Sequence, residues 1–454
     1  MTFHIHFVGI KGTGMSALAQ ITANLENTVI TGSDVSERFF TDTLLEQAGI
    51  NVLPFSPANV TGADLVVVSA AYGQDHPEIA RAQELNIPVL TYPQYLGRLM
   101  SERRGVCITG THGKTTTTAM VGATLIDANF APTVVVGSNV HILGGNAFVG
   151  SGEFFVAESC EYRRHFLNYR PEFLVILNME LDHPDYFKDL NDVVSAFQEL
   201  AEKVPSHGKV IIWGDDPVRS NISSKAEVIT YGLSESNDFR AVNVHFNAGK
   251  SSFEVLHNNT CLGTFTLGVM GNHNVLNALA TIALTTTLGV PIEQIKASLA
   301  KFSGTKRRFE QLGQYNGALI MDDYAHHPTE VNTTLEGAHL AYPDRKIIAV
   351  FQPHTFTRTE KLLDQFARSF THADEVIVTN IFASAREKTS KTGISSELLA
   401  EQIREQGKEV RFFPDFAAIT AYLSDSINEK SLVITMGAGD IYKVGVGLVE
   451  LGKK

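Results

Sequence analysis

Short apolar segments alternate with longer amphipathic segments along nearly the whole chain of 454 residues. The apolar segments have the length of buried strands, and the amphipathic segments have the periodicity of helices. This order predicts parallel β-sheets covered by helices, because two parallel neighbouring strands need a long crossover connection. The pattern therefore predicts an α/β fold. At roughly 150 residues per domain, we expect about three domains.

The alternation falls into three blocks, and we predict domains at residues 1–103, 104–313 and 314–454. The first limit lies in the polar stretch SERRG, residues 101–105. The segment 239–269 differs from the rest of the central block, because it alternates polar with apolar residues and contains turn sequences typical of hairpins. We therefore expect a mostly parallel central sheet with a small antiparallel portion.

The predicted strands are apolar and end at loops rich in glycine or polar residues. They cover residues 4–10, 28–32, 65–70, 88–90, 106–109, 154–157, 173–178, 209–213, 318–322, 347–351, 375–380, 410–413 and 432–436. A helix is predicted over residues 274–288. The first and third blocks show the same order of elements and are expected to share an architecture.

Charge and hydropathy exclude several classes of partner. The chain has 37 Lys and Arg residues against 49 Asp and Glu residues, and its net charge of -12 repels a phosphate backbone. We therefore expect no nucleic acid partner. No apolar run approaches the roughly 20 residues that cross a bilayer, and the first predicted strand leaves no room for a signal peptide. We expect a cytoplasmic protein with no membrane partner.

A glycine-rich loop with the sequence TGTHGKTTTT joins a predicted strand to a helical segment. Gly110 and Gly113 let backbone N–H groups approach phosphate oxygens, and the start of the helix adds partial positive charge. Lys114 is expected to reach the terminal phosphates, and Thr115 is expected to hold Mg2+. Ile108 stands where the usual pattern has glycine, so the loop is a shortened variant. The loop predicts a nucleoside triphosphate site.

A second glycine-rich turn, GIKGTGMSALA, follows the first predicted strand. Gly12, Gly14 and Ala17 fit the spacing of a dinucleotide-binding turn. Asp34 lies at the end of the next strand, where an acid that binds a ribose is expected. Taken alone, this turn predicts a nucleotide that contains a diphosphate, such as NAD. Two such loops in one chain need two ligands or two roles.

Acidic clusters follow two strands of the central block. VAESCEYRRHF places Glu158 at the end of one strand. NMELDHPDYF follows another strand and contains Asn178, Glu180, Asp182, His183 and Asp185. Because ligands gather at the carboxyl ends of parallel strands, we expect Glu158 and His183 to face the phosphate loop and to hold Mg2+.

Four later motifs add polar groups at strand ends or helix starts, and they read GNHNVLNALA, KRRFE, DDYAHHPTE and FQPHTFTRT. Asn274 stands at a predicted helix start, where capping is the ordinary role of asparagine. The arginines of KRRFE either form a solvated basic patch or neutralise phosphates. The last two motifs place histidine and arginine in loops of the third block, which favours a site there over ordinary surface.

Together with GAGD near the end of the chain, these motifs closely resemble, in the same order, those of the Mur ligases of peptidoglycan synthesis. The resemblance covers essentially the whole chain. It implies an N-terminal Rossmann-like domain for a UDP-sugar, a central P-loop-type ATPase domain and a C-terminal Rossmann-like domain that closes over the site. Within the family, the chain resembles the branch that uses ATP and Mg2+ to join L-alanine to the lactyl carboxylate of UDP-N-acetylmuramate through an acyl phosphate.

The resemblance also implies roles for individual residues. The expected ATP contacts are Gly110, Thr111, His112, Gly113, Lys114, Thr115, Thr116, Asn274 and Arg307 or Arg308. The expected UDP-sugar contacts are Gly12, Thr13, Gly14, Met15, Ser16, Ser33, Asp34, Asp323 and Tyr324. The expected metal ligands are Thr115, Glu158 and His183, and the expected catalytic residues are Lys114, His327, His354 and Arg358. ESCEYRRHF stands where many members read EADESDASF, so Glu158 is preferred to Glu161.

Three alternatives stay open at this point. An NAD-dependent oxidoreductase would use the first glycine-rich turn, but it has no use for a triphosphate loop. A regulatory P-loop switch would hydrolyse ATP or GTP slowly and without an acceptor. A recycling ligase of the same family would join a tripeptide to the same sugar nucleotide. The sequence also leaves four details open. They are the choice among L-alanine, glycine and L-serine, the base that deprotonates the amine, whether a lysine is carbamylated, and whether the protein is a monomer or a homodimer.

Overall fold

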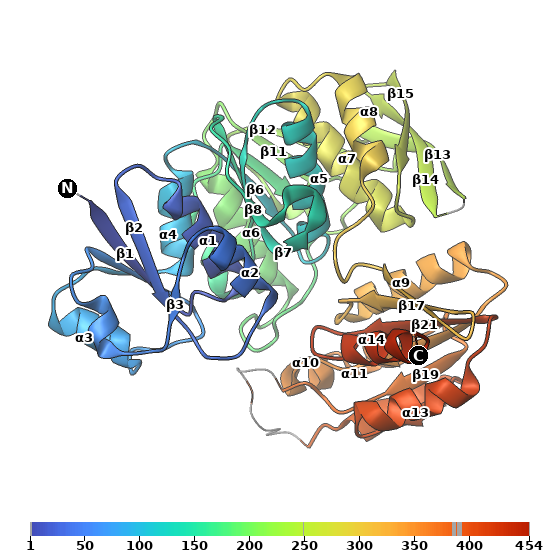
Figure 1. The fold of residues 1–454 in the computed structure, drawn as a ribbon. Coiled ribbons are helices and arrows are strands. Elements are labelled where there is room, and N and C mark those ends of the chain that lie inside the picture. Colours follow the sequence, from blue (N-terminus) through green and yellow to red (C-terminus); the bar gives the residue numbers. More distant parts are fainter. Residues whose placement is uncertain (1, 248, 384–386, 388–392, 454) are drawn as a thin grey trace.

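The computed structural model describes residues 2–247, 249–383, 387 and 393–453. Within these residues, three β-sheets of five, ten and six strands follow one another along the chain. Figure 1 shows the first and central sheets packed side by side, with the third sheet and its helices below them. The predicted α/β class is confirmed, and every strand predicted from the sequence overlaps an observed strand. No helix of the described residues is long and apolar enough to cross a membrane.

The first sheet is parallel and has the order β3-β2-β1-β4-β5. Its strands are β1 (Phe3–Val8), β2 (Thr28–Ser33), β3 (Val52–Leu53), β4 (Leu65–Val68) and β5 (Val89–Thr91). Its helices are α1 (Thr13–Ala23), α2 (Phe40–Gln47), α3 (Pro77–Glu84), α4 (Tyr92–Met100) and the 3₁₀ helix η1 (Pro57–Val60). The strand order reverses at β1, so the loop after β1 opens at a topological switch point, where such sheets bind ligands.

The central sheet has the order β15-β14-β13-β12-β11-β10-β6-β9-β7-β8. Its strands are β6 (Arg104–Thr109), β7 (Thr133–Val140), β8 (Gly145–Phe148), β9 (Phe154–Glu158), β10 (Phe173–Ile176), β11 (Lys209–Trp213), β12 (Glu227–Gly232), β13 (Phe239–Asn247), β14 (Lys250–His257) and β15 (Thr260–Leu267). Its helices are α5 (Lys114–Asp127), α6 (Leu190–Lys203), α7 (Asn272–Thr287), α8 (Ile292–Lys301), η2 (His141–Leu143), η3 (Tyr162–Asn168) and η4 (Arg219–Asn221). Strands β13 to β15 pair antiparallel, as predicted.

The third sheet has the order β16-β17-β21-β18-β19-β20 and is parallel except for β16. Its strands are β16 (Glu310–Tyr315), β17 (Ala318–Asp323), β18 (Lys346–Phe351), β19 (Glu375–Val378), β20 (Glu409–Phe412) and β21 (Ser431–Met436). Its helices are α9 (Pro328–Ala341), α10 (Phe356–Lys361), α11 (Leu363–Arg368), α12 (Ser396–Glu405), α13 (Phe416–Ser426) and α14 (Tyr442–Leu451). The predicted limit at residue 313 falls inside β16, which pairs with β17, and the division into domains stays a prediction.

Apolar packing joins the first two blocks into one body. Phe7 and Tyr95 of the first block belong to the same core cluster as Cys107 and Phe166 of the central block. Because successive side chains of a strand point to opposite faces, the neighbours of Cys107 on β6 lie in a second cluster with helices α5, α7 and α8. Both faces of the central sheet are therefore covered. The core residues of the third block cluster among themselves.

Candidate active site

The phosphate loop connects β6 to α5 at the centre of the ten-stranded sheet. Gly110 and Gly113 have φ values of 140° and 82°, which glycine adopts at little cost. A Cβ atom on Gly113 would also collide with the Asn277 side chain of α7. The loop is held from the next strand, because the Asn178 side chain accepts a hydrogen bond from the His112 N–H at 2.8 Å and donates one to the His112 carbonyl at 3.1 Å. The loop conformation is therefore preformed.

Lys114 lies folded over this loop. Its ammonium donates hydrogen bonds to the carbonyls of Gly110 and Thr111 and contacts Glu161 Oε2 at 3.0 Å. Burial alone would lower the pKa of Lys114, but the neighbouring Glu161 carboxylate outweighs burial and raises it. The lysine is therefore cationic at neutral pH. A cation at this place fits a loop that binds a triphosphate.

Glu158 and Thr115 form the second polar group beside the loop. Thr115 Oγ1 donates to Glu158 Oε1 at 2.9 Å, and the Gly137 N–H donates to Glu158 Oε2 at 2.6 Å. A carboxylate and a hydroxyl at this separation offer the oxygen ligands that Mg2+ prefers. These donors fit a magnesium ion bound next to the triphosphate loop. Thr116 is buried one residue further along α5.

Glu161 joins this group, although Glu158 is the metal ligand expected from the sequence. Glu161 is 1% exposed, and its Oε1 lies 3.9 Å from Nε2 of His183. Burial lowers the pKa of His183. Cys160, Glu161 and His183 therefore form one cluster of possible metal ligands. The signal in the sequence was the spacing: Glu161 keeps its place in the family motif while the residues around it differ.

The glycine-rich turn of the first block opens into the same cavity as Glu158. This cavity has a volume of about 450 Å³. Its lining includes Gly12, Thr13, Gly14, Met15, Ser69, Tyr92, Gly137, Glu158, Cys160, His165 and Tyr169. The first glycine-rich turn and Glu158, which accepts a hydrogen bond from Thr115 of the phosphate-loop motif, therefore border one space between the first and central blocks.

The polar residues near this turn hold the turn itself. The Asp34 carboxylate accepts a hydrogen bond from the Lys11 N–H at 2.7 Å. Ser33 is buried and donates to Glu78 at 2.5 Å. Ser16 donates to the Thr13 carbonyl at 3.0 Å. Ser33 and Asp34 thus lie behind the cavity lining, and their expected contact with the UDP-sugar stays a prediction.

We expect Gly14→Val to weaken UDP-sugar binding by about 10- to 100-fold, because a Cβ on Gly14 would lie 2.6 Å from the Tyr92 ring in the cavity wall. This range corresponds to an overpacking cost of about 1–3 kcal/mol. ATP affinity should not change. Gly447→Val is the matched control, since a Cβ on this α14 glycine meets no described atom within 4 Å. Calorimetry with each nucleotide measures both effects, and a loss confined to ATP would mean that the two sites are interchanged.

Asn274 and the two arginines of KRRFE are held by different parts of the fold. Asn274, in the first turn of α7, donates to the Met270 carbonyl at 2.8 Å. Arg307 is bound within the third block, because its guanidinium donates to Asp322 at 2.9 Å and to the Gly437 carbonyl at 2.7 Å. Arg308 lies 3.6 Å from Glu330, which also contacts the phosphate loop. Of the two arginines, the geometry favours Arg308 as the ATP contact.

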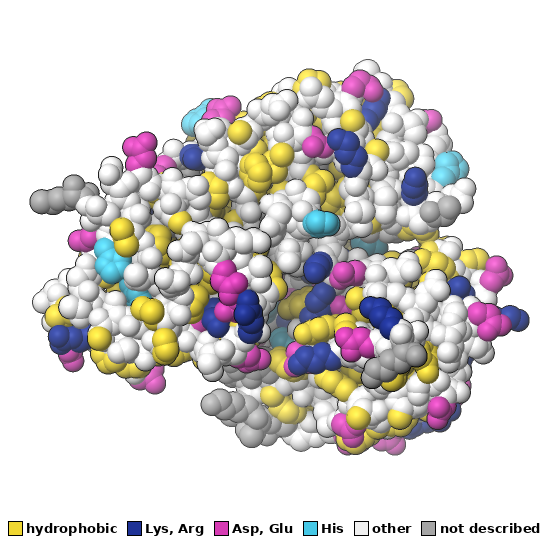
Figure 2. Space-filling model, viewed as in Figure 1, with side chains coloured by type: hydrophobic (Ala, Val, Ile, Leu, Met, Phe, Trp, Pro, Cys, Tyr) yellow, Lys and Arg dark blue, Asp and Glu magenta, His cyan; other side chains and the backbone are white. Residues whose placement is uncertain are grey.

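The third block meets the phosphate loop and the loop after β10 mainly through charged side chains. We call this region the interblock contact. It comprises His112, Glu180, Leu181, Asp182, His327, Thr329, Glu330 and Arg358. His112 Nδ1 lies 3.2 Å from Glu330, and His112 Nε2 lies 3.5 Å from Glu180. Burial would lower the pKa of His112, but the two neighbouring carboxylates raise it to about 9. Figure 2 shows acidic and basic side chains along the groove between the third block and the rest.

Arg358 provides the closest ion pair of the interblock contact. Its Nε and Nη2 lie 2.9 Å and 2.8 Å from Asp182 Oδ1, and its Nη1 lies 2.8 Å from Nδ1 of His354. Burial would raise the pKa of Asp182, but the Arg358 guanidinium holds it well below its ordinary value. The His354 ring stacks on Phe382. The structure therefore brings His354 and Arg358 together, next to the acidic loop after β10.

His327, Asp323 and Tyr324 lie at the end of β17. His327 caps α9: its Nδ1 accepts from the Thr329 N–H at 3.3 Å, and its Nε2 lies 3.3 Å from the Leu181 carbonyl. Burial lowers the pKa of His327 to about 4. Burial raises the pKa of Asp323 to about 6, and its carboxylate accepts from the Phe309 and Ala325 N–H groups. The Tyr324 ring lies under both arginines of KRRFE.

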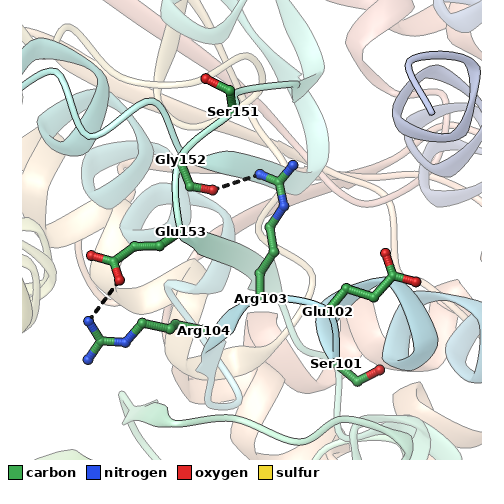
Figure 3. A pocket seen from close by; sticks show the side chains of 7 residues that line it. All are labelled: Ser101, Glu102, Arg103, Arg104, Ser151, Gly152 and Glu153. Carbon is green, nitrogen blue, oxygen red and sulfur yellow. Dashed lines mark hydrogen bonds and ion pairs between the residues drawn. The ribbon is translucent and has the colours of Figure 1, made fainter. Parts of the chain in front are cut away.

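A second hollow, of about 610 Å³, lies at the junction of residues 101–104 with residues 151–153. Figure 3 shows that two arginines dominate it. Arg103 donates to the Gly150 and Gly152 carbonyls, and Arg104 pairs with Glu153 and Glu172. The Arg104 guanidinium is therefore paired with carboxylates, and the Arg103 guanidinium is held by backbone carbonyls.

Comparisons with known proteins agree with this geometry. Family models match residues 4–104 (Mur ligase family, catalytic domain), 108–285 (Mur ligase middle domain) and 307–439 (Mur ligase, glutamate ligase domain). The chain belongs to the Mur ligase family. It is 60% identical to a curated UDP-N-acetylmuramate–L-alanine ligase of Desulfitobacterium hafniense over 99% of this chain and 100% of that protein.

Two crystal structures extend the comparison. The UDP-N-acetylmuramate–alanine ligase of Thermotoga maritima has a TM-score of 0.83 and 29% identity and covers 99% of both chains. A murein peptide ligase of Psychrobacter arcticus has a TM-score of 0.71 and 26% identity, covering 100% of this chain and 99% of the other. The family resemblance inferred from the motifs is confirmed.

Proposed function

We propose that this chain is an ATP-dependent ligase that joins L-alanine to the lactyl carboxylate of UDP-N-acetylmuramate in peptidoglycan precursor synthesis. The observation that carries the proposal is the cavity that the first glycine-rich turn shares with Glu158, whose carboxylate accepts a hydrogen bond from Thr115 of the phosphate-loop motif. A sugar nucleotide bound at the turn can extend its acid toward a triphosphate bound at the phosphate loop. The full-length similarity to curated L-alanine ligases supports this choice of substrates. Because ATP and a UDP-sugar are both required, we expect a cytoplasmic reaction.

The chemistry needs an activated acid, because a free carboxylate has no adequate leaving group. The lactyl carboxylate oxygen attacks the γ-phosphorus of ATP, and the bond from this phosphorus to the β–γ bridging oxygen breaks. ADP leaves, and the sugar nucleotide now carries an acyl phosphate. The neutral amine of L-alanine then attacks the acyl carbon, the bond from this carbon to the phosphate oxygen breaks, and inorganic phosphate leaves with the proton that the amine loses. Lys114 and Arg308 stabilise the negative charge on the transferred group. Mg2+ bound by Thr115 and Glu158, with Glu161 and His183 nearby, would supply further charge neutralisation.

Neither candidate base among the histidines is well placed by its contacts. Burial lowers the pKa of His327 to about 4, its Nδ1 accepts from the Thr329 N–H, and its Nε2 lies 3.3 Å from the Leu181 carbonyl. His354 has its Nδ1 at 2.8 Å from the Arg358 guanidinium. We therefore propose that these residues mainly position the third block, and that the L-alanine amine reaches the acyl phosphate already deprotonated. Closure of the third block over the cavity excludes water from the acyl phosphate.

The alternatives differ in how well they use these features. An NAD-dependent oxidoreductase leaves the phosphate loop and Lys114 without a role. A P-loop switch leaves the shared cavity without a role. The recycling ligase, which accepts a tripeptide, is the strongest competitor, since a murein peptide ligase has the same three-block architecture. Its lower TM-score, 0.71 against 0.83 for the alanine ligase, favours L-alanine.

An acceptor screen tests the proposed function. The protein is incubated with ATP, Mg2+ and UDP-N-acetylmuramate, and phosphate release is followed with L-alanine, glycine, L-serine or the tripeptide. We expect the highest kcat/KM with L-alanine and no release without the sugar nucleotide. Release without any acceptor would support the switch, and a preference for the tripeptide would support the recycling ligase. Sedimentation of the same sample distinguishes monomer from homodimer.

A further inference from the structure

Two histidines and a glutamate from three separate segments meet at the interblock contact. One ligand atom of each of His112, Glu180 and His327 lies within 4.8 Å of the others. We propose that these side chains bind a divalent transition-metal ion, represented by Zn2+, at a site separate from the Mg2+ ligands at Thr115 and Glu158. This site goes beyond the proposed ligase reaction, which does not require it.

The separations between Glu180 and the two histidines are close to those of ligands around a tetrahedral ion. His112 Nε2 lies 3.5 Å and His327 Nδ1 lies 3.8 Å from Glu180 Oε2. Bonds of about 2.0–2.1 Å at tetrahedral angles place neighbouring ligands roughly 3.3–3.4 Å apart. Small side-chain shifts therefore complete three bonds and leave a fourth position for water. Two imidazoles and one carboxylate suit Zn2+ and its neighbours in the transition series, whereas Mg2+ prefers oxygen ligands.

The Nε2 atom of His112 gives an independent sign of a missing ligand. It is buried and has no hydrogen-bond partner among the residues that the structure describes. Its approach to Glu180 at 3.5 Å is too long for a strong hydrogen bond. A buried polar atom without a partner is costly, so structures usually satisfy it. A metal ion between His112 and Glu180 would satisfy this nitrogen.

The opposite ring nitrogens of both histidines are held as in known metal sites. His112 Nδ1 faces the Glu330 carboxylate at 3.2 Å, and His327 Nε2 faces the Leu181 carbonyl at 3.3 Å. Histidine ligands usually donate the second ring N–H to a carboxylate or a carbonyl, which fixes the tautomer and the ring orientation. His112 thus presents Nε2 to Glu180, and Nδ1 of His327 lies 3.8 Å from the same carboxylate oxygen.

The carboxylate ligand is oriented as well. Thr329 Oγ1 donates a hydrogen bond to Glu180 Oε2 at 2.5 Å. The Thr329 N–H reaches Nδ1 of His327 at 3.3 Å, a weak hydrogen bond that metal binding would replace. Because His112 lies in the phosphate loop and His327 begins α9, a bound ion would tie the third block to the loop.

Metal titration of the whole protein tests the site. Zn2+ is titrated calorimetrically in excess Mg2+, and Co2+ is titrated with detection of the visible absorption typical of a nitrogen-ligated, low-coordinate ion. We expect one tight site in the wild type, which Glu180→Gln and His327→Ala weaken by at least about 100-fold. Glu330→Gln removes an outer partner and should weaken binding by about 10- to 100-fold.

Two variants control for other metal sites. His207→Ala removes an exposed histidine elsewhere, and Glu158→Gln removes the candidate magnesium ligand. Both should bind Zn2+ as tightly as the wild type. Loss of the tight site in Glu158→Gln, no tight site in the wild type, or unchanged affinity in Glu180→Gln would overturn the proposal. Glu180 is 37% exposed, so Glu180→Gln decides the question even if His327→Ala does not fold.

Discussion

Replacing Lys114 by methionine should lower kcat/KM for ATP-dependent ligation by on the order of 10³-fold, the scale seen when a charge that stabilises transferred phosphate is removed. Lys114 is the cation closest to the loop carbonyls of Gly110 and Thr111, where a triphosphate would replace those contacts. Methionine keeps most of the side-chain volume and removes the charge together with the N–H donors of the ammonium group. Phosphate release with all three substrates present measures the effect.

Loss of the lysine also leaves the buried Glu161 without its cationic partner, with His183 3.9 Å away, and this second effect has to be separated from the first. Breaking a buried ion pair on one side costs about 3–5 kcal/mol of folding free energy. The double variant Lys114→Met/Glu161→Gln removes both charges and should recover most of the stability but none of the activity. Wild-type turnover in Lys114→Met would contradict the assignment of the phosphate site, and recovery of activity in the double variant would mean that Lys114 acts only through stability.

The strands and loops of the site followed from local sequence patterns. The phosphate loop needs glycine at positions of positive φ, and its spacing to Lys114 is visible in the sequence. Helix α4 was missed, although Thr91 and Gln94 form a capping box that could have indicated its start. Strands β7 and β8, which pair with each other, were also missed. In β7, Gly137 and the polar residues after it interrupt the apolar run.

The contacts that assemble the site could not be predicted, because they join residues far apart in the sequence. His112 and Glu330 are separated by 218 positions, and Asp182 and Arg358 by 176. The choice between Arg307 and Arg308 likewise depends on where the Asp322 carboxylate lies in the folded third block. Local patterns therefore identify which residues carry charge, and the packing of the three sheets decides which charges meet.

Replacing Arg358 by methionine should release the third block from the central block and lower kcat/KM by about 10²- to 10³-fold. The guanidinium makes two contacts below 3.0 Å with Asp182, and both side chains are buried. Removing one partner leaves an uncompensated buried carboxylate at a cost of about 3–5 kcal/mol, and each 1.4 kcal/mol is a factor of about ten in an equilibrium. Small-angle scattering should show a larger radius of gyration.

A second variant and a control separate this role from direct substrate contact. In Asp182→Asn/Arg358→Met neither buried charge remains, so docking should recover while any contact of Arg358 with substrate stays lost. Arg411→Met is the control, since Arg411 is 44% exposed and its partner Glu375 keeps Lys346. If the double variant docks as the wild type does but stays inactive, Arg358 also binds substrate. If Arg358→Met keeps the wild-type radius of gyration, the ion pair does not hold the blocks together. The unpaired Asp182 carboxylate would then cost too little free energy to shift the equilibrium between the docked and the released third block.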